Sequence, residues 1–376
     1  MLFLLQLSTI LASATLGGYI SKKFNQPVVL GQLIFGIIIG PSVLNIVVPT
    51  ETFLHMSDLG VILLMFIAGL ETDLNELIRS GKTAFIIAIG GVVLPIALGI
   101  AASSLFGNPL LEGVFIGVIL SATSVSITVE TLREIDKLKT TQGMTILGAA
   151  VIDDVMGIVL LSLMTGFVSP GEGHSFISVI VKLLLFFVVS FIIGLLIIRF
   201  SRRYFLTKNT SKNIAVIALV FCLLFGFFAE EMGVAAIIGA YLAGIVLSET
   251  PFRRKITNSI QDLSYVLLTP IFFVVTGMKV DISQMFYDLP FGMVLLAAAV
   301  LGKMIGCGGI AKLLGFEKKE SLQIGIGMVP RGEVALIVTD IGLKLGVIPK
   351  GLFASIIFMI LITTIGTPPF LKRSFE

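Results

Sequence analysis

The chain has 376 residues, of which 56% are hydrophobic and only 13% are charged. Because soluble domains carry about 25% charged residues, this composition excludes a soluble globular protein and predicts an all-α protein that crosses a membrane many times. The net charge of +3 comes from basic residues scattered among loops, so we expect membrane lipid and not nucleic acid as a partner. Cys222 and Cys307 fall in apolar runs, which argues against a disulfide framework or a metal site.

Hydropathy predicts about 13 transmembrane helices, since a bilayer crossing takes roughly 20 apolar residues. The predicted runs are approximately 2–20, 28–44, 57–72, 83–105, 112–130, 141–167, 175–199, 211–229, 234–248, 257–278, 290–312, 320–342 and 350–371. Lys22 and Lys23 follow the first run instead of preceding it. We therefore interpret that run as a retained helix and not as a signal peptide.

Alternate loops between these runs are rich in Lys and Arg. Twenty of the 26 basic residues lie in loops on one side of the predicted membrane. The positive-inside rule makes that side cytoplasmic. We therefore expect the N-terminus outside, the C-terminus in the cytoplasm and an odd number of crossings.

The chain resembles itself at a constant shift of 208 residues. The matched positions are Gly31 with Gly239, Gly36 with Gly244, Gly69 with Gly277, Asp73 with Asp281, Glu112 with Glu320 and Gly117 with Gly325. The first six runs then fall on the last six, with 175–199 as a linker helix. The shift spans seven crossings, so the two six-helix repeats are predicted to be inverted in the membrane. Inverted repeats are typical of secondary transporters, which favours a transporter over a channel, a receptor or a membrane enzyme.

The fifth and twelfth helices, which are equivalent in the two repeats, are predicted to be discontinuous. Pro330 and Gly332 lie at the centre of run 320–342, where they weaken helical hydrogen bonding. In run 112–130, the hydroxyl-rich segment 121–128 can replace lost backbone partners, although close packing of small residues is the alternative. Two broken helices would cross at mid-depth and create a polar pocket.

Charged residues within the apolar runs are the strongest functional signal. Asp153 and Asp154 lie at the centre of the sixth run, where each charge costs roughly 2.5–3.5 kcal/mol on insertion scales. Such acids usually mark an ion path or a proton relay; a salt bridge that only fixes helix packing is the alternative. Lys303 lies at a similar depth and could pair with Asp153. For Arg331 and Glu333 we expect a structural role, neutralising helix dipole ends at the break.

At this point the residues resemble the monovalent cation/proton antiporters of the second cation–proton antiporter superfamily, in particular its bacterial sodium/proton members. The resemblance rests on Asp153-Asp154, Thr123-Ser124, Lys303, and Arg331 with Glu333. It covers essentially the whole chain. The related glutathione-gated potassium efflux members usually carry Gln-Asp at the acidic pair and a cytosolic nucleotide-binding domain, and this sequence has neither.

The resemblance implies a thirteen-helix fold with a mobile ion-translocation core and a dimerisation scaffold. By position the core would comprise 83–167 and 290–371, the scaffold 1–82 and 200–289, with the helix 175–199 as linker. Two such chains would form a homodimer in the inner or plasma membrane of a prokaryote.

The resemblance also implies roles for individual residues. Asp154 would bind the cation, assisted by oxygen atoms near Thr123 and Ser124, and Asp153 would pair with Lys303. We therefore expect an electrogenic antiporter that exchanges Na⁺ (or Li⁺) for H⁺ by alternating access, with no cofactor and no enzymatic activity. The nearest alternative is a K⁺/H⁺ antiporter. An intramembrane aspartyl protease is disfavoured because adjacent aspartates on a helix point about 100° apart, and an ion channel is the third alternative.

Overall fold

The protein is helical throughout the part of the chain that a computed structural model describes, residues 2–72, 74–168, 176–205, 214–279 and 289–376. Its α-helices are α1 (Leu2–Lys23), α2 (Val28–Ile39), α3 (Glu51–Glu71), α4 (Leu74–Leu105), α5 (Leu110–Ser121), α6 (Val125–Glu134), α7 (Thr141–Val168), α8 (Phe176–Phe205), α9 (Ile214–Glu231), α10 (Ala236–Ser248), α11 (Arg253–Leu263), α12 (Thr269–Met278), α13 (Leu289–Lys303), α14 (Ile310–Leu313), α15 (Lys318–Gly327), α16 (Glu333–Lys344) and α17 (Lys350–Phe375). Two π-helical turns, η1 (Ser264–Leu268) and η2 (Met304–Gly309), join α11 to α12 and α13 to α14. Ten stretches of the described chain are long and apolar enough to cross a membrane, and three of them combine consecutive helices of this list.

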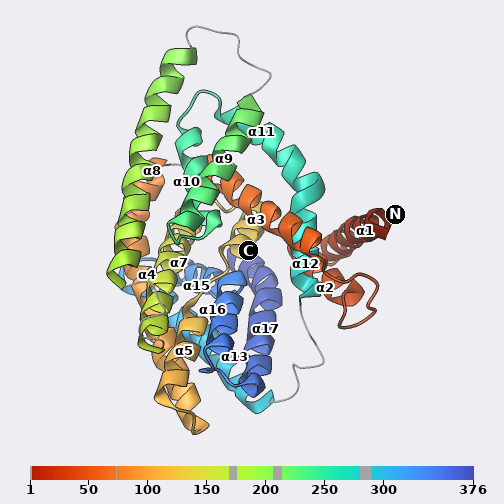
Figure 1. Ribbon diagram of the computed structural model, residues 1–376, viewed down its shortest axis with the longest axis vertical. Coiled ribbons are helices and arrows are strands. Elements are labelled where there is room, and N and C mark those ends of the chain that lie inside the picture. The colour runs from red at the N-terminus through yellow and green to blue at the C-terminus, as the bar shows by residue number, and fades with distance from the viewer. Residues whose placement is uncertain (1, 73, 169–175, 206–213, 280–288) are drawn as a thin grey trace.

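The helices pack into two bundles (Figure 1). The first bundle contains α1–α3 and α9–α12, and the second contains α4–α7 and α13–α17. Helix α8 contacts α7 of the second bundle and α10 of the first. The two bundles meet mainly where α2 and α3 lie against α6 and α17. The cavity and the inter-bundle contacts described below lie at this boundary.

The helix bounds follow the 208-residue shift. Shifted by 208, the first residues of α2 (28), α5 (110) and α6 (125) become 236, 318 and 333, the first residues of α10, α15 and α16. Of the matched positions, Asp73 and Asp281 lie outside the described residues.

Two matched glycine pairs lie at equivalent helix crossings. A Cβ added to Gly277 would lie 3.0 Å from the Cα of Gly36, and one added to Gly244 would lie 2.8 Å from the Cα of Gly69. The shift converts Gly36 into Gly244 and Gly69 into Gly277, so it converts one contact into the other. The glycines are present because α2 and α12, and likewise α3 and α10, approach more closely than any side chain allows.

Both interruptions lie in the second bundle and touch each other. Helix α5 ends at Ser121 and α6 begins at Val125, whereas α15 ends at Gly327 and α16 begins at Glu333. The Ser124 N–H donates to the carbonyl of Pro330 at 2.7 Å. Backbone groups freed by one break thus bond to the other break, which is how non-helical backbone is tolerated inside an apolar protein interior.

Candidate functional site

The two aspartates of α7 lie beside the crossing of the broken helices and are shielded from solvent. Asp153 is 1% exposed and Asp154 is 3% exposed. Two basic side chains of the same region, Lys303 and Arg331, are both 0% exposed. Buried charges at this depth require partners, because an uncompensated charge is far more costly than a paired one.

Asp153 is held through one carboxylate oxygen. Its Oδ2 accepts hydrogen bonds from Lys303 Nζ at 2.9 Å and from Thr123 Oγ1 at 2.6 Å. Its Oδ1 has no hydrogen-bond partner among the described residues. Thr123 and Lys303 therefore contact the same carboxylate oxygen of Asp153, and the other oxygen accepts no hydrogen bond from a described residue. Lys303 is the last residue of α13 before the π-helical turn η2, an interruption often seen at functional sites.

Arg331 stands in the break between α15 and α16. Its guanidinium donates to the carbonyl of Ala122 at 2.9 Å and to that of Ala299 at 3.1 Å. Ala122 caps the C-terminus of α5, where unpaired carbonyls carry partial negative charge. This is the position expected for dipole compensation. Glu333 is the first residue of α16; its side chain lies outside the described residues.

Further hydroxyl groups complete the crossing: Thr128, from the predicted hydroxyl-rich segment, and Thr363 and Thr364, which the sequence did not single out. Thr128 Oγ1 donates to the carbonyl of Gly327, at the end of α15, at 2.7 Å. From α17, Thr364 Oγ1 donates to the Arg331 carbonyl, and Thr363 Oγ1 accepts from the Arg331 N–H at 3.3 Å. The only available signal was a pair of adjacent threonines in an apolar run. Ser124, a predicted ion-binding residue, lies at the crossing with its Oγ 3.3 Å from Ser126 Oγ.

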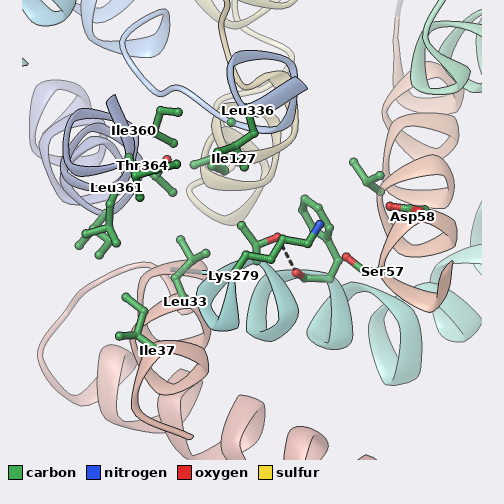
Figure 2. Close-up of a pocket in the computed structure, with 16 residues that line it drawn as sticks. Leu33, Ile37, Ser57, Asp58, Ile127, Lys279, Leu336, Ile360, Leu361 and Thr364 are labelled. Atoms are coloured by element: carbon green, nitrogen blue, oxygen red, sulfur yellow. Dashed lines mark hydrogen bonds between the residues drawn. The ribbon is translucent and has the colours of Figure 1, made fainter. Parts of the chain in front are cut away.

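A cavity at the boundary between the bundles reaches this crossing (Figure 2). Its volume is about 100 Å³. Ser57 and Asp58 of α3 line one side, and Leu361 and Thr364 of α17 line another. Gly332, in the break between α15 and α16, also lines the cavity, and a Cβ there would lie 2.6 Å from Ser124 Oγ. The cavity thus reaches the helix break that contains Arg331.

Comparisons with known proteins identify relatives of the chain. The family model described as "Sodium/hydrogen exchanger, transmembrane" matches residues 11–373. The probable Na⁺/H⁺ antiporter GerT of Bacillus cereus is 41% identical over 375 residues, covering 100% of both chains. The Na⁺/H⁺-K⁺ antiporter GerN of the same organism is 40% identical, covering 99% of this chain and 96% of that one. The sodium proton antiporter MjNhaP1 from Methanocaldococcus jannaschii superposes with a TM-score of 0.79 at 19% identity, covering 99% and 96% of the two chains, and so shares the fold.

Proposed function

The chain belongs to the sodium/hydrogen exchanger family, and we propose on that basis that it exchanges Na⁺ or Li⁺ for H⁺ across a membrane by alternating access. The observation that carries this proposal is the buried Asp153-Asp154 pair beside two touching helix breaks. Carboxylate, carbonyl and hydroxyl oxygens converge there, and hard cations such as Na⁺ prefer oxygen ligands.

In this proposal Asp154 binds the transported cation, and Asp153 changes its interaction with Lys303 when the cation arrives. Oδ1 of Asp153 is available to a cation or a proton, whereas Oδ2 is held by Lys303 and Thr123. When a cation occupies Asp154, its positive charge competes with Lys303 for Asp153. Thr123 supports this exchange of partners by fixing the orientation of the Asp153 carboxylate.

The charge balance of the site couples cation binding to proton release. Asp153 and Asp154 are balanced by Lys303 and Arg331, which are all buried. A bound Na⁺ adds one positive charge to this low-dielectric region, and release of a proton restores the balance. If Asp154 is instead protonated before the cation arrives, and Asp154 and Lys303 each release one proton per Na⁺, then two protons exchange for one Na⁺, so transport moves net charge and is driven by the membrane potential, about 2.3 kcal/mol per charge per 100 mV.

We propose the membrane arrangement that the sequence predicts: 13 crossings in two inverted repeats, with the N-terminus outside and the C-terminus in the cytoplasm. Its support is threefold. Ten helices are long enough to cross, and the three shorter apolar helices Val28–Ile39, Ala236–Ser248 and Val334–Leu343 bring the number to thirteen. Helix bounds repeat at the 208 shift, and the equivalent glycine contacts exchange under it.

We propose that the two bundles are the core and the scaffold that the sequence predicts. The second bundle contains the buried charges and would move as the core. The first would remain fixed as the scaffold of a homodimer, in the membrane of a prokaryotic cell. Helix α8, which contacts both bundles, would be the linker.

The decisive experiment is cation-driven proton flux in proteoliposomes that contain the purified protein, with Na⁺, Li⁺ and K⁺ added in turn. We expect saturable proton flux with Na⁺ and Li⁺, in which protons move in the direction opposite to the cation. The rate should depend on the membrane potential. Proton flux with K⁺ alone would assign the chain to potassium exchange. The alternative is worth testing because the relative GerN is named a Na⁺/H⁺-K⁺ antiporter. Proton flux that none of the three cations drives would overturn the proposal.

A further inference from the structure

The boundary between the bundles holds a cavity at each end, and polar contacts join the two bundles across the boundary at one of these ends. The cavity of Figure 2 is lined by Ile37 near the end of α2 and by Ser57 near the start of α3. At the opposite ends of these same helices lie Val28, the first residue of α2, and Glu71, the last residue of α3. Fourteen residues of helix separate Ser57 from Glu71, or about 21 Å. The second end is the one where the basic loops lie, which the positive-inside rule predicts to be cytoplasmic.

The first closing contact caps a helix of one bundle with an acid of the other. Both carboxylate oxygens of Glu134, the last residue of α6, accept from the N–H of Val28, at 2.6 and 2.7 Å. This N–H belongs to the first turn of α2 and has no intrahelical acceptor. The carboxylate also faces the positive end of the α2 dipole.

The second contact is a cluster around Arg133 of α6. Its guanidinium lies 3.3 Å from Glu71 Oε1 and 4.4 Å from the centre of the Tyr265 ring, both in the first bundle. Tyr265 in turn donates from its hydroxyl to Glu130 Oε2 at 2.8 Å. Gln261 of α11 donates to the same Glu71 oxygen at 2.8 Å. Glu71 is therefore also held by a residue of its own bundle.

The third contact joins the end of α17 to the turn between α1 and α2. Lys372 Nζ donates to the carbonyl and to the side-chain oxygen of Asn25 at 2.6 and 2.9 Å. Asn25 adopts a positive φ of 55°, which an asparagine tolerates better than most residues and which turns its carbonyl toward α17.

We infer that Glu134, the Arg133 cluster and Lys372 form an inter-bundle clasp that ties the two bundles together at the basic-loop end of the boundary, around a second cavity that Gln32 also lines, and that this clasp must open in every transport cycle. The inference deepens the proposed function, because alternating access requires the two bundles to move relative to each other, and the clasp holds them together. Its chemistry suits repeated opening. The contacts are partly exposed hydrogen bonds and ion pairs, which water can replace at little cost when the bundles separate, whereas a packed apolar seam could not be rewetted so readily.

A reversible cross-link tests whether the clasp opens. The substitutions Asn25→Cys and Lys372→Cys, in full-length protein that also carries Cys222→Ala and Cys307→Ala, place thiols on both sides of the third contact. We expect a cleavable bifunctional maleimide to lower the rate of Na⁺/H⁺ exchange in proteoliposomes at least tenfold. Cleavage of the linker should restore the rate. The matched control is Gln142→Cys with Glu320→Cys, whose side chains are joined by a 2.6 Å hydrogen bond within the second bundle. The cross-linked control should exchange normally. Normal exchange by the cross-linked 25–372 protein would overturn the clasp.

A second measurement does not depend on transport. Glu134→Ala removes the cap on α2 and should favour the state in which the basic-loop end is open. In that state a reporter at Gln32→Cys, on the cavity at the clasp end, should react with a water-soluble maleimide several-fold faster. A reporter at Ser57→Cys, on the opposite cavity, should react several-fold more slowly. Unchanged labelling of both reporters would overturn the inference. Labelling that changes as expected in a protein that moves no cation would sustain the clasp and overturn the proposed function instead.

Discussion

Asp153 uses its two carboxylate oxygens differently: Oδ2 accepts from Lys303 and Thr123, and Oδ1 accepts from no described residue. This asymmetry separates a fixed half of the group from a responsive half. In the proposed function this asymmetry gives the two adjacent acids of α7 different roles. One can hold the transported cation while the other changes partner, since neighbours on a helix point about 100° apart.

Replacing Asp154 with asparagine should abolish exchange while the protein remains folded. The change removes a costly buried charge, so insertion and folding should not suffer, but it deletes the carboxylate that is proposed to bind the cation. Proton flux in proteoliposomes measures the loss, and size-exclusion chromatography in detergent reports folding. Asp262→Asn, at an exposed position of α11, is the control and should exchange at the normal rate. Sodium-driven proton flux by the Asp154→Asn protein at that rate would contradict the assignment.

Lys303→Gln tests whether the buried pair is structural, electrical or both. Removing the lysine leaves Asp153 as a buried uncompensated charge, at a cost of about 3–5 kcal/mol, so the thermal unfolding temperature should fall. Asp153→Asn in the same protein should recover part of the loss. If lysine supplies the second proton, exchange by Lys303→Gln becomes electroneutral or stops. A sodium-driven current from that variant would show that Lys303 is only a packing residue.

At the scale of elements, equivalent helices of the two repeats solve the same geometric problem with the same residues. Gly69→Ala would place a Cβ 2.2 Å from the carbonyl oxygen of Tyr241, and Gly277→Ala would place one 2.2 Å from that of Leu33. Both obstacles are backbone atoms, so the helices must separate.

We therefore predict that Gly69→Ala and Gly277→Ala each lose about 1–3 kcal/mol of stability, as overpacked cores do, and that the two losses are similar. Thermal unfolding in detergent provides the comparison. Gly226→Ala is the control, because its new Cβ would lie 3.5 Å from the nearest atom, an ordinary contact. A large loss at one position and none at the other would argue against equivalent crossings.

Matched residues do not always keep matched roles. Glu320 closes a capping box at the start of α15, accepting from the Glu317 N–H at 2.8 Å. Its repeat equivalent, Glu112, follows Pro109 at the N-cap of α5. Proline has no N–H to donate, and Glu112 Oε1 has no hydrogen-bond partner among the described residues. The repeat thus conserves the position of the acid and loses its capping contact.

At the scale of the whole molecule, a single site exposed alternately to the two sides predicts competition between cation and proton. Lowering the pH favours the protonated site, so the apparent affinity for Na⁺ should weaken about tenfold per pH unit for each proton displaced, over the acidic limb. Sodium titrations of proton flux at several pH values measure this. The maximal rate at saturating Na⁺ should change much less. An apparent affinity that does not move with pH would mean separate sites for the two ions.

The sequence by itself determined the membrane class, the positions of the helices and the location of the buried charges. Each follows from local properties: apolar runs of bilayer length, Pro330 and Gly332 within one such run, and the insertion cost of Asp153 and Asp154 at the centre of another. The 208-residue shift could also be recognised in the sequence. Close helix crossings require glycine, and a constant spacing between matched glycines does not depend on knowing the structure.

Only the tertiary structure decided which atoms meet. That Thr123 bonds to Asp153, and that Thr128, Thr363 and Thr364 satisfy the crossing, depends on how helices far apart in the chain are rotated about their axes, which hydropathy does not encode. The inter-bundle clasp was hidden for a related reason. Arg133 and Lys372 lie at helix ends on the basic side, where positive charge already follows from membrane topology, and their partners on the other bundle are set by three-dimensional packing alone.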